Sequence, residues 1–281
     1  MRLLLRAFEI AVVVTVVTEL FFYALRRYEL AGSGDARGLR RGALNVFGSF
    51  LAQCGAILFA QLGHLGSPFW PFPLRRPAAT PPVILLHGHA GSRTALVWLA
   101  WRLRRDGFEN VIGVRHRPLG ADAYGKAKAL AATIERVLLE TGAVQVDVVA
   151  HSLGGLVARA YIREYGGAAR VRRLVTLGTP HQGTRVAAFA LDAAARSLLP
   201  GSRLLQDLGR EDPVPTILPV TSIFSTFDAR ILPCRSAFYP GAANVEVDAI
   251  GHDAMLFSPK ISRLVVEALA DVPALRRSSN S

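Results

Sequence analysis

The sequence predicts an α/β fold, a mostly parallel sheet flanked by helices, preceded by an N-terminal pair of hydrophobic helices. After residue 83, short apolar segments of strand type alternate with segments of helical spacing, which is typical of parallel βαβ units with helices on both sheet faces. Two long apolar runs, 7–25 and 42–63, come before this region. The mean hydropathy of +0.30 is high for a soluble enzyme and indicates contact with a membrane.

The composition excludes several classes of protein. With 51% hydrophobic and 19% charged residues, the chain of 281 residues is not intrinsically disordered. Its two cysteines, Cys54 and Cys234, are too few for a disulfide framework, and we expect both to be free thiols. Arginine accounts for 30 of the 33 basic residues behind the net charge of +12, and these arginines are scattered. No nucleic-acid-binding motif accompanies them, so no nucleic-acid partner is expected.

Both apolar runs are long enough to cross a membrane as helices. Residues 7–25 would span about 28 Å at 1.5 Å per residue, close to the hydrocarbon thickness of a bilayer, although Glu9 and Glu19 lie inside this run. Residues 42–63 carry no formal charge and contain small residues suited to helix–helix contact. A buried core hairpin and a cleaved signal peptide are the alternatives, but no Ala-x-Ala cleavage site follows the first run.

We expect residues 1–66 to form a helical hairpin that anchors the protein in a membrane. More arginines lie between the two runs than on either outer flank, which places the connecting loop in the cytoplasm and the following domain on the non-cytoplasmic side. These arginines are Arg26, Arg27, Arg37, Arg40 and Arg41. Residues 67–82 contain six prolines and predict an extended linker. A folded domain at 83–273 and a flexible tail at 274–281 complete the division.

Hydrophobic periodicity predicts the elements of the folded domain. Strands are expected at 83–86, 110–114, 145–150, 173–177, 220–225 and 245–250, and helices at 95–105, 124–141 and 155–165. The segment 186–208 is rich in Ala and Leu and is helical by propensity. An ordinary packing helix of the sheet and, by the resemblance given below, a lid over a site fit this segment equally well.

The strongest local signal is the segment AHSLGG around Ser152, which stands between an expected strand and an expected helix. A serine on such a turn, with small residues two before and two after it, is typical of a nucleophile elbow. Ala150 replaces the usual first glycine and is still small. A serine hydroxyl needs a base, and that base needs a third group to orient it.

Two histidines follow Ser152 in the sequence, His181 and His252. His252 comes directly after the strand expected at 245–250, so it lies on a loop at a strand end, where a catalytic base belongs. His181 follows Thr-Pro at another strand end. We therefore expect His252 to be the base and His181 to be a structural or rim residue.

Three aspartates are candidates for the group that orients the base. Asp228 follows the strand expected at 220–225 and is the preferred choice, although a turn or a helix cap would also account for it. Asp253 is next to His252, and a neighbour on the same loop rarely aims its carboxylate back at that ring. Asp248 lies within an expected strand and fits less well.

The loop HGHAGS, which follows the first expected strand, is rich in small residues. Such residues let backbone N–H groups approach an oxyanion. We expect the donors to be the backbone N–H groups of Leu153, directly after the nucleophile, and of His89. Gly88 and Ala90 are the alternatives to His89. No metal-ligand cluster is evident in the sequence, so neither a metal nor another cofactor is expected.

Together these segments resemble the α/β-hydrolase superfamily, specifically its bacterial triacylglycerol lipase and esterase branch, and eukaryotic inositol-lipid deacylases share the same signatures. The matching segments are 83–92, 148–159, 174–184, 225–228 and 251–259, within a region that covers about 70% of the chain. The segment LGTPHQG is the most specific of them. The resemblance implies hydrolysis of carboxylic esters through Ser152, Asp228 and His252, and it does not extend to the N-terminal runs.

These features predict a membrane-anchored serine hydrolase that cleaves esters through an acyl-serine intermediate. By the resemblance, the membrane is expected to be a bacterial inner membrane. The anchor favours lipid esters over small soluble ones. An acyltransferase or thioesterase with the same triad remains an alternative, as does a non-catalytic membrane interaction protein on the same fold. The expected partners are an ester or lipid substrate and the membrane, and the sequence predicts no oligomeric state.

Overall fold

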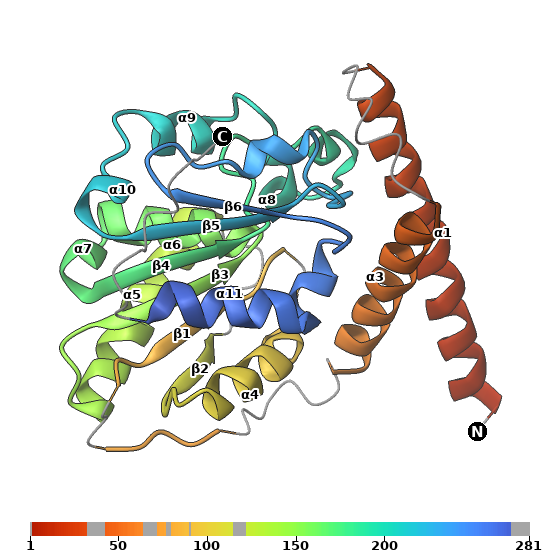
Figure 1. Ribbon diagram of the computed structural model, residues 1–281. Coiled ribbons are helices and arrows are strands. Elements are labelled where there is room, and N and C mark those ends of the chain that lie inside the picture. Colours follow the sequence, from red (N-terminus) through yellow and green to blue (C-terminus); the bar gives the residue numbers. More distant parts are fainter. Residues whose placement is uncertain are drawn as a thin grey trace, which may run out of the picture.

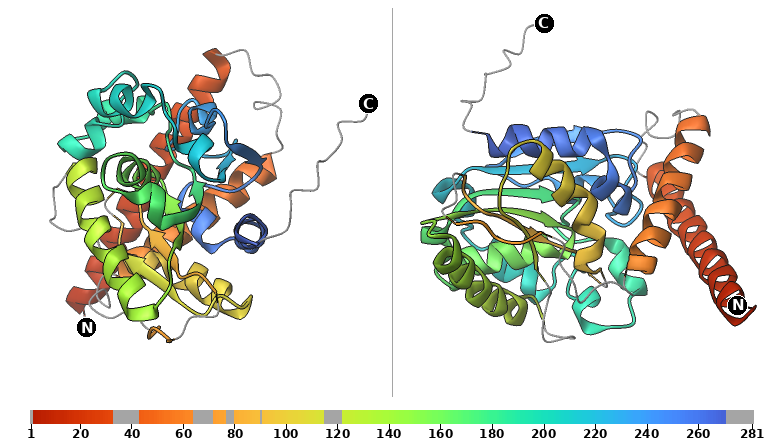
Figure 2. Two further views of the ribbon diagram at one scale, coloured as in Figure 1. Left: turned by 90° about the vertical axis from the view of Figure 1, so that its left-hand side faces the viewer. Right: turned by 90° about the horizontal axis from the view of Figure 1, so that it is seen from below.

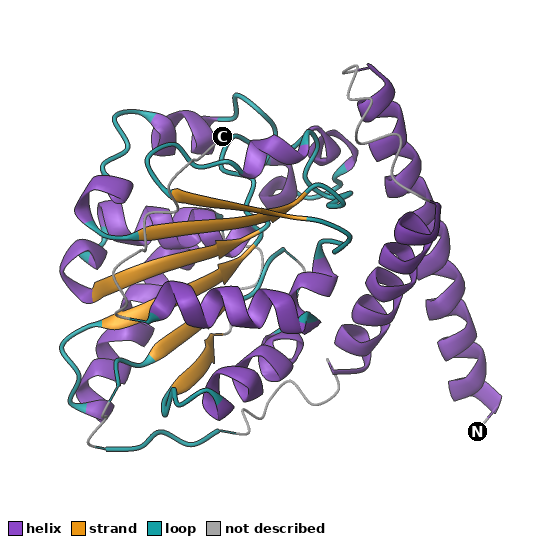
Figure 3. Ribbon diagram, in the orientation of Figure 1, coloured by secondary structure: helices purple, strands orange, loops and turns teal. Residues whose placement is uncertain are grey.

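A parallel six-stranded sheet forms the centre of the molecule (Figure 3). The computed structural model describes residues 2–32, 43–63, 72–76, 80–89, 91–114 and 122–270. The strand order is β2-β1-β3-β4-β5-β6, and every neighbouring pair is parallel. The strands are β1 Val83–Leu86, β2 Val111–Val114, β3 Val146–His151, β4 Val171–Leu177, β5 Val220–Ser225 and β6 Ala243–Val247. The predicted strands are confirmed, with ends that differ by up to three residues.

Helices cover both faces of this sheet because successive side chains of a strand point to opposite faces. Ile84 and Leu86 of β1 belong to the core beneath α5 and α6, whereas Val83 and Leu85 belong to the core beneath α4 and α11 (Figure 1). These helices are α4 Val97–Arg105, α5 Ala123–Thr141, α6 Leu153–Glu164 and α11 Pro259–Leu269. All of these β1 side chains are fully buried.

The region between β4 and β5 is divided into short helices rather than one long one. Polar caps and a glycine impose the breaks: the Asp192 carboxylate accepts a hydrogen bond from Ala195 N, Ser202 caps the next helix, and Gly201 has a φ of +76°. The short helices of this region are η3 Arg185–Phe189, α8 Ala193–Arg196, α9 Arg203–Gly209 and α10 Val214–Ile217. Elsewhere in the described chain the short helices are η2 Arg93–Leu96, α7 Gly167–Arg170, η4 Cys234–Ala237 and η5 Asp253–Phe257. The segment 186–208 is therefore helical, as its composition predicts, but in short pieces rather than one continuous helix.

The two N-terminal helices, α1 Arg2–Gly32 and α3 Ala43–Gly63, lie against one another beside the edge at which the strands end (Figures 1 and 2). The Tyr23 hydroxyl is 2.9 Å from Ser49 Oγ across this pair, which we call the hairpin. The predicted helices are confirmed, but α1 runs past its apolar run and includes Arg26 and Arg27. The expectation that these two arginines lie in the connecting loop is therefore wrong, and Arg37, Arg40 and Arg41 lie outside the described residues.

The hairpin turns polar side chains inward and apolar side chains outward. Thr15, Glu19 and Arg26 of α1 are buried, as are Ser49 and Gln53 of α3. The outer surface is apolar, and its exposed side chains include Leu5, Phe8, Ile10, Val13, Val14, Val17, Leu20, Phe47 and Leu51. This is the reverse of the distribution in a water-soluble domain.

Both hairpin helices are long and apolar enough to cross a membrane, by length and composition alone. The core helix of a soluble protein passes the same test, but such a helix is mostly buried. Here 17% and 22% of the apolar windows of α1 and α3 are buried. The exposure of these windows therefore separates the hairpin from an ordinary core hairpin.

Two of the expected segments lie wholly or partly beyond the described residues. The tail at 274–281 is outside them, as are 67–71 and 77–79 of the expected linker. In the described part of that linker, Arg75 N donates to Asn110 Oδ1 at 2.7 Å, and Arg75 O accepts from Asn110 Nδ2. These two hydrogen bonds hold Arg75 next to the start of β2. Cys54 and Cys234 are free thiols, as expected.

Candidate active site

Ser152 occupies a strained turn between β3 and α6. Its φ of 57° and ψ of −128° are rare for a residue with a side chain, and such a conformation costs about 1–3 kcal/mol. Neighbouring loops hold the turn: Ser152 N donates to Leu177 O, and the Thr179 hydroxyl donates to Ser152 O, both at 2.9 Å. The turn leaves Ser152 at the carboxyl edge of the sheet, where it lines a cavity of about 430 Å³.

His252 and Asp228 meet at the same edge. His252 lies between β6 and η5, Asp228 follows β5, and the distance from His252 Nδ1 to Asp228 Oδ2 is 2.6 Å. Both side chains are buried. The other carboxylate oxygen of Asp228 accepts hydrogen bonds from Arg230 N and Ile231 N at 2.8 and 3.0 Å. The loop after β5 therefore orients the carboxylate toward the ring.

The two alternative aspartates have other partners. The Asp253 carboxylate accepts a hydrogen bond from Gln53 Nε2 at 2.8 Å. The Asp248 carboxylate accepts one from the Thr226 hydroxyl at 2.5 Å, on the exposed surface. Of the three candidates, Asp228 is thus the aspartate whose carboxylate contacts the His252 ring.

The Asp228 carboxylate changes the proton affinity of His252. Burial lowers the pKa of His252, but the negative charge of Asp228 and the hydrogen bond to it outweigh burial, so the pKa lies above its ordinary value. With Nδ1 engaged by the carboxylate, Nε2 is the ring atom that can accept a proton from another group. His252 also lines the cavity that Ser152 lines.

Gly178, in the segment LGTPHQG, lies directly against the Asp228–His252 pair. Its φ is +54°, in the region that favours glycine. A Cβ atom at this position would lie 3.0 Å from Asp228 Oδ2 and 3.1 Å from His252 Nδ1. A larger residue at this position would collide with the Asp228–His252 pair. The close packing therefore explains why a glycine is needed here, independently of the motif's resemblance to a family.

His151 contacts His252 from the other side, although no role was expected for it from the sequence. Its Nε2 lies 3.1 Å from His252 O, and the two ring centroids are 4.6 Å apart. Burial and the neighbouring His252 lower the pKa of His151 to about 4, so the ring is neutral near pH 7 and donates from Nε2 to that carbonyl. In the sequence, the position of His151 directly before Ser152 was the signal that could have indicated its place near the site.

Of the two residues expected to supply oxyanion donors, Leu153 directly follows Ser152 and His89 lines the same cavity as Ser152. Leu153 is the first residue of α6, so its N–H has no partner within the helix. The loop with Gly88 and His89 lies close, since a Cβ atom at Gly88 would be 2.7 Å from Ser152 Cβ. The exposed His89 imidazole is 3.0 Å from Asp192 Oδ2, and Ala90 lies outside the described residues.

The hairpin also contributes to the cavity, which the sequence analysis did not anticipate. Phe22 of α1 and Ile57 and Ala60 of α3 line the same cavity as Ser152 and His252. Further lining comes from the segment between β4 and β5, including Val186, Ala187, Phe189 and Leu198. Within the described part of the chain, no group of three or more His, Cys, Asp or Glu is arranged to hold a metal ion.

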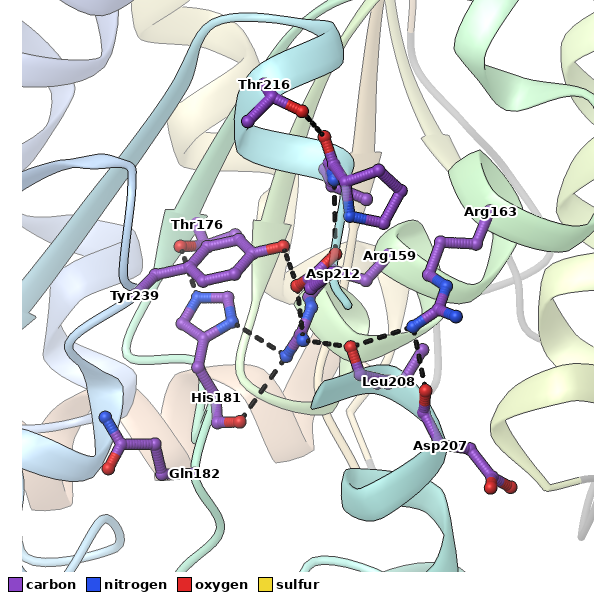
Figure 4. Close-up of polar contacts among 12 residues, drawn as sticks. Arg159, Arg163, Thr176, His181, Gln182, Asp207, Leu208, Asp212, Thr216 and Tyr239 are labelled. Carbon is purple, nitrogen blue, oxygen red and sulfur yellow. Dashed lines mark hydrogen bonds and ion pairs between the residues drawn. The ribbon is translucent and has the colours of Figure 1, made fainter. Parts of the chain in front are cut away.

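His181 belongs to a different cluster, beside α6 (Figure 4). Its Nε2 lies 3.1 Å from the Thr176 hydroxyl, and its ring stacks on Tyr239 with centroids 4.1 Å apart. Next to it, Arg159 of α6 donates to Asp212 Oδ2 at 2.6 Å, and the Tyr239 hydroxyl donates to the same oxygen. The cluster joins α6 to the chain after α9, consistent with the structural role expected for His181.

Comparison of the sequence with known proteins gives similarity over part of the chain. A family model described as a domain of unknown function (DUF7379) matches residues 61–193. A triacylglycerol lipase of Pseudarthrobacter phenanthrenivorans is 32% identical over 131 residues, which cover 40% of this chain and 36% of that protein. A triacylglycerol lipase of Burkholderia plantarii is equally similar, over 32% of its length. The chain thus spans about a third of the curated relatives it matches.

Solved structures give a wider match. Aspergillus fumigatus lipase B superimposes with a TM-score of 0.63 at 20% identity, over 72% of this chain and 56% of that one. The mature Bacillus licheniformis lipase BlEst2 superimposes with a TM-score of 0.60 at 19% identity, over 72% of this chain and 96% of that one. At such identities the likeness concerns the fold. Together with the parallel sheet and its flanking helices, it shows that the chain has the α/β-hydrolase fold of lipases and esterases.

Proposed function

We propose that this protein is a membrane-anchored serine hydrolase that cleaves carboxylic esters, and lipid esters in particular. The observation that carries the proposal is the 2.6 Å contact between His252 and Asp228, in a cavity that Ser152 also lines. Hydroxyl, imidazole and carboxylate from three separate loops are the components of a nucleophilic triad. The similarity to triacylglycerol lipases over 131 residues supports ester hydrolysis as the reaction.

In the proposed mechanism, Ser152 Oγ attacks the acyl carbonyl while His252 Nε2 takes the hydroxyl proton. Asp228 holds the ring in the tautomer with a proton on Nδ1 and stabilises the imidazolium that forms. His252 then returns its proton to the leaving alcohol, and an acyl-serine remains. Water, deprotonated by His252, hydrolyses this intermediate and restores Ser152.

The negative charge that develops on the carbonyl oxygen needs donors that are already in place. We assign this role to the backbone N–H groups of Leu153 and His89. Leu153 begins α6, so the positive end of the helix dipole adds to the stabilisation. Loss of one such donor typically reduces the rate by a factor of about 10²–10³.

The hairpin is the proposed anchor, with residues 83–273 as the catalytic domain. Its outward side chains are apolar over most of α1 and α3, as expected of helices that face lipid. The excess of arginine between the helices favours the non-cytoplasmic side for the catalytic domain. The Arg26 side chain points into the protein, where it donates to Thr226 O at 2.7 and 3.0 Å. The proposed orientation in the membrane therefore rests on the other arginines between the two apolar runs.

The proposed reaction predicts that Ser152→Ala abolishes ester cleavage by the full-length protein. We expect hydrolysis of a panel of esters, including dispersed triacylglycerols, to fall by a factor of roughly 10⁴ or more, with the circular dichroism unchanged. A fluorophosphonate probe should label the wild type and not the variant. If the wild type cleaves no ester and takes no label, the protein is a non-catalytic form of the fold. Products formed with a competing alcohol distinguish hydrolysis from acyl transfer.

The proposed anchor predicts that charges on the outer face weaken membrane attachment. Val17→Glu combined with Leu51→Glu places two carboxylates on exposed apolar positions, each costing about 2.5–3.5 kcal/mol at the centre of a membrane helix. We expect more of this variant than of the wild type to leave the membrane pellet after a carbonate wash. Tyr28→Glu, exposed near the end of α1, is the control. Equal retention of all three proteins would contradict the anchor.

A further inference from the structure

We propose that the hairpin forms one wall of the acyl-binding pocket, so that the acyl chain of a lipid ester binds between the hairpin and the catalytic domain. This inference rests on the proposed ester hydrolysis and adds a binding role to helices that otherwise serve as an anchor. The cavity of about 430 Å³ is within the range of small-molecule sites. It is bounded by the candidate nucleophile on one side and by α1 and α3 on another.

The wall residues occupy one face of each helix. On α3, Ile57 and Ala60 follow Gln53 at intervals of four and seven residues, so the three share a face toward the hydrolase. On α1, Phe22 lies three residues after the buried Glu19. Phe22, Ile57 and Ala60 present hydrocarbon to the cavity, which suits an acyl chain, while the polar Gln61 lies one position further along α3.

Contacts on both sides of the cavity keep the hairpin in place. Arg230 pairs with the Glu19 carboxylate, and its guanidinium lies 3.9 Å from the centre of the Phe22 ring. Phe189 of η3 meets Phe21 edge to face at 5.3 Å between centroids. Arg185 pairs with Glu29 at 2.8 Å. The wall is therefore attached to the loop that carries Asp228 and to the segment opposite.

A chain-length series tests the wall in the full-length protein. Ala60→Phe should fill the pocket, reducing kcat/KM for long-chain esters at least about tenfold while short-chain esters change less than about twofold. Ile57→Ala should shift preference the other way, toward bulkier acyl groups. Ala52→Phe, on the exposed side of the same helix, is the matched control and should leave the profile unchanged.

The outcomes separate this inference from the proposed function. A wild type that hydrolyses esters, with the same chain-length profile in Ala60→Phe and Ile57→Ala, would contradict the acyl wall and leave the hydrolase intact. A wild type inactive on every ester would overturn the hydrolase itself. A parallel loss for short and long esters in Ala60→Phe, with no shift in Ile57→Ala, would indicate a general disturbance and also contradict the wall.

A separate set of hydrogen bonds identifies Gln53 of α3 as a positioning residue for the base, and we infer that it acts through the loop after His252. Gln53 Oε1 accepts from Asp253 N and Ala254 N at 2.9 and 3.1 Å, while Nε2 donates to Asp253 Oδ2 at 2.8 Å. The side chain is 1% exposed. These three bonds cap the start of η5, which begins directly after the catalytic ring.

Gly251, on the other side of His252, shows how closely this amide fits. A Cβ atom at Gly251 would lie 2.6 Å from Gln53 Oε1 and 3.0 Å from Gln53 Cβ. A glycine is therefore required for the hairpin amide to reach the loop. The residues on both sides of His252 touch the same hairpin side chain.

Gln53→Met removes the three hydrogen bonds while keeping a side chain of similar length. We expect kcat to fall about 10²-fold, since small displacements of a catalytic group have effects of this size, with KM for long-chain esters within about twofold of the wild type. Ser49→Ala, which removes a buried polar contact within the hairpin, is the control and should keep kcat. An unchanged kcat in Gln53→Met, or an equal loss in Ser49→Ala, would contradict the role.

Discussion

The contact between His252 and Asp228 joins the loops after β5 and β6, and much of the carboxyl edge is arranged around it. Gly178 leaves room for the pair, since a Cβ there would be 3.0 Å from the Asp228 carboxylate. His151 holds the backbone of His252, and the N–H groups of Arg230 and Ile231 hold the carboxylate. Each of these contacts restricts the ring to the orientation in which Nδ1 is engaged and Nε2 is available for proton transfer.

The hairpin also contacts the loops at the carboxyl edge of the sheet that surround the His252–Asp228 contact. Polar residues in the middle of apolar helices are costly in lipid, yet one carboxylate oxygen of Glu19 pairs with Arg230, and Gln53 forms hydrogen bonds with the start of η5. These contacts with loops near the site offset part of the free-energy cost of placing two polar side chains in apolar helices. The same helices leave their outer faces apolar, so the hairpin combines an exposed apolar surface with residues that line the cavity beside Ser152.

The strands, the nucleophile turn and the candidate triad could be predicted because each depends on local pattern. Apolar strands followed by polar loops put Ser152, Asp228 and His252 at one edge of a parallel sheet, whatever the details of packing. The contacts of Gln53 and His151 with the loop of His252 join residues distant in the chain and could not be predicted, although the position of His151 directly before Ser152 was a signal. The segment 186–208 is helical as predicted, but its division into short helices depends on the caps at Asp192 and Ser202. Glu19 was recognised as costly in the apolar run, but its partner could come only from the fold.

The titration of His252 in the full-length protein, followed by NMR with labelled histidine, tests the role of Asp228 most directly. Burial lowers the pKa of His252 and the carboxylate raises it, so the wild type should titrate above the ordinary histidine value of about 6.5. In Asp228→Asn the effect of burial remains but the carboxylate charge is lost, so the pKa of His252 should fall below that of the wild type. The signal of His252 is assigned by its absence from the spectrum of His252→Gln. A His252 pKa that is the same in the wild type and in Asp228→Asn would contradict the account.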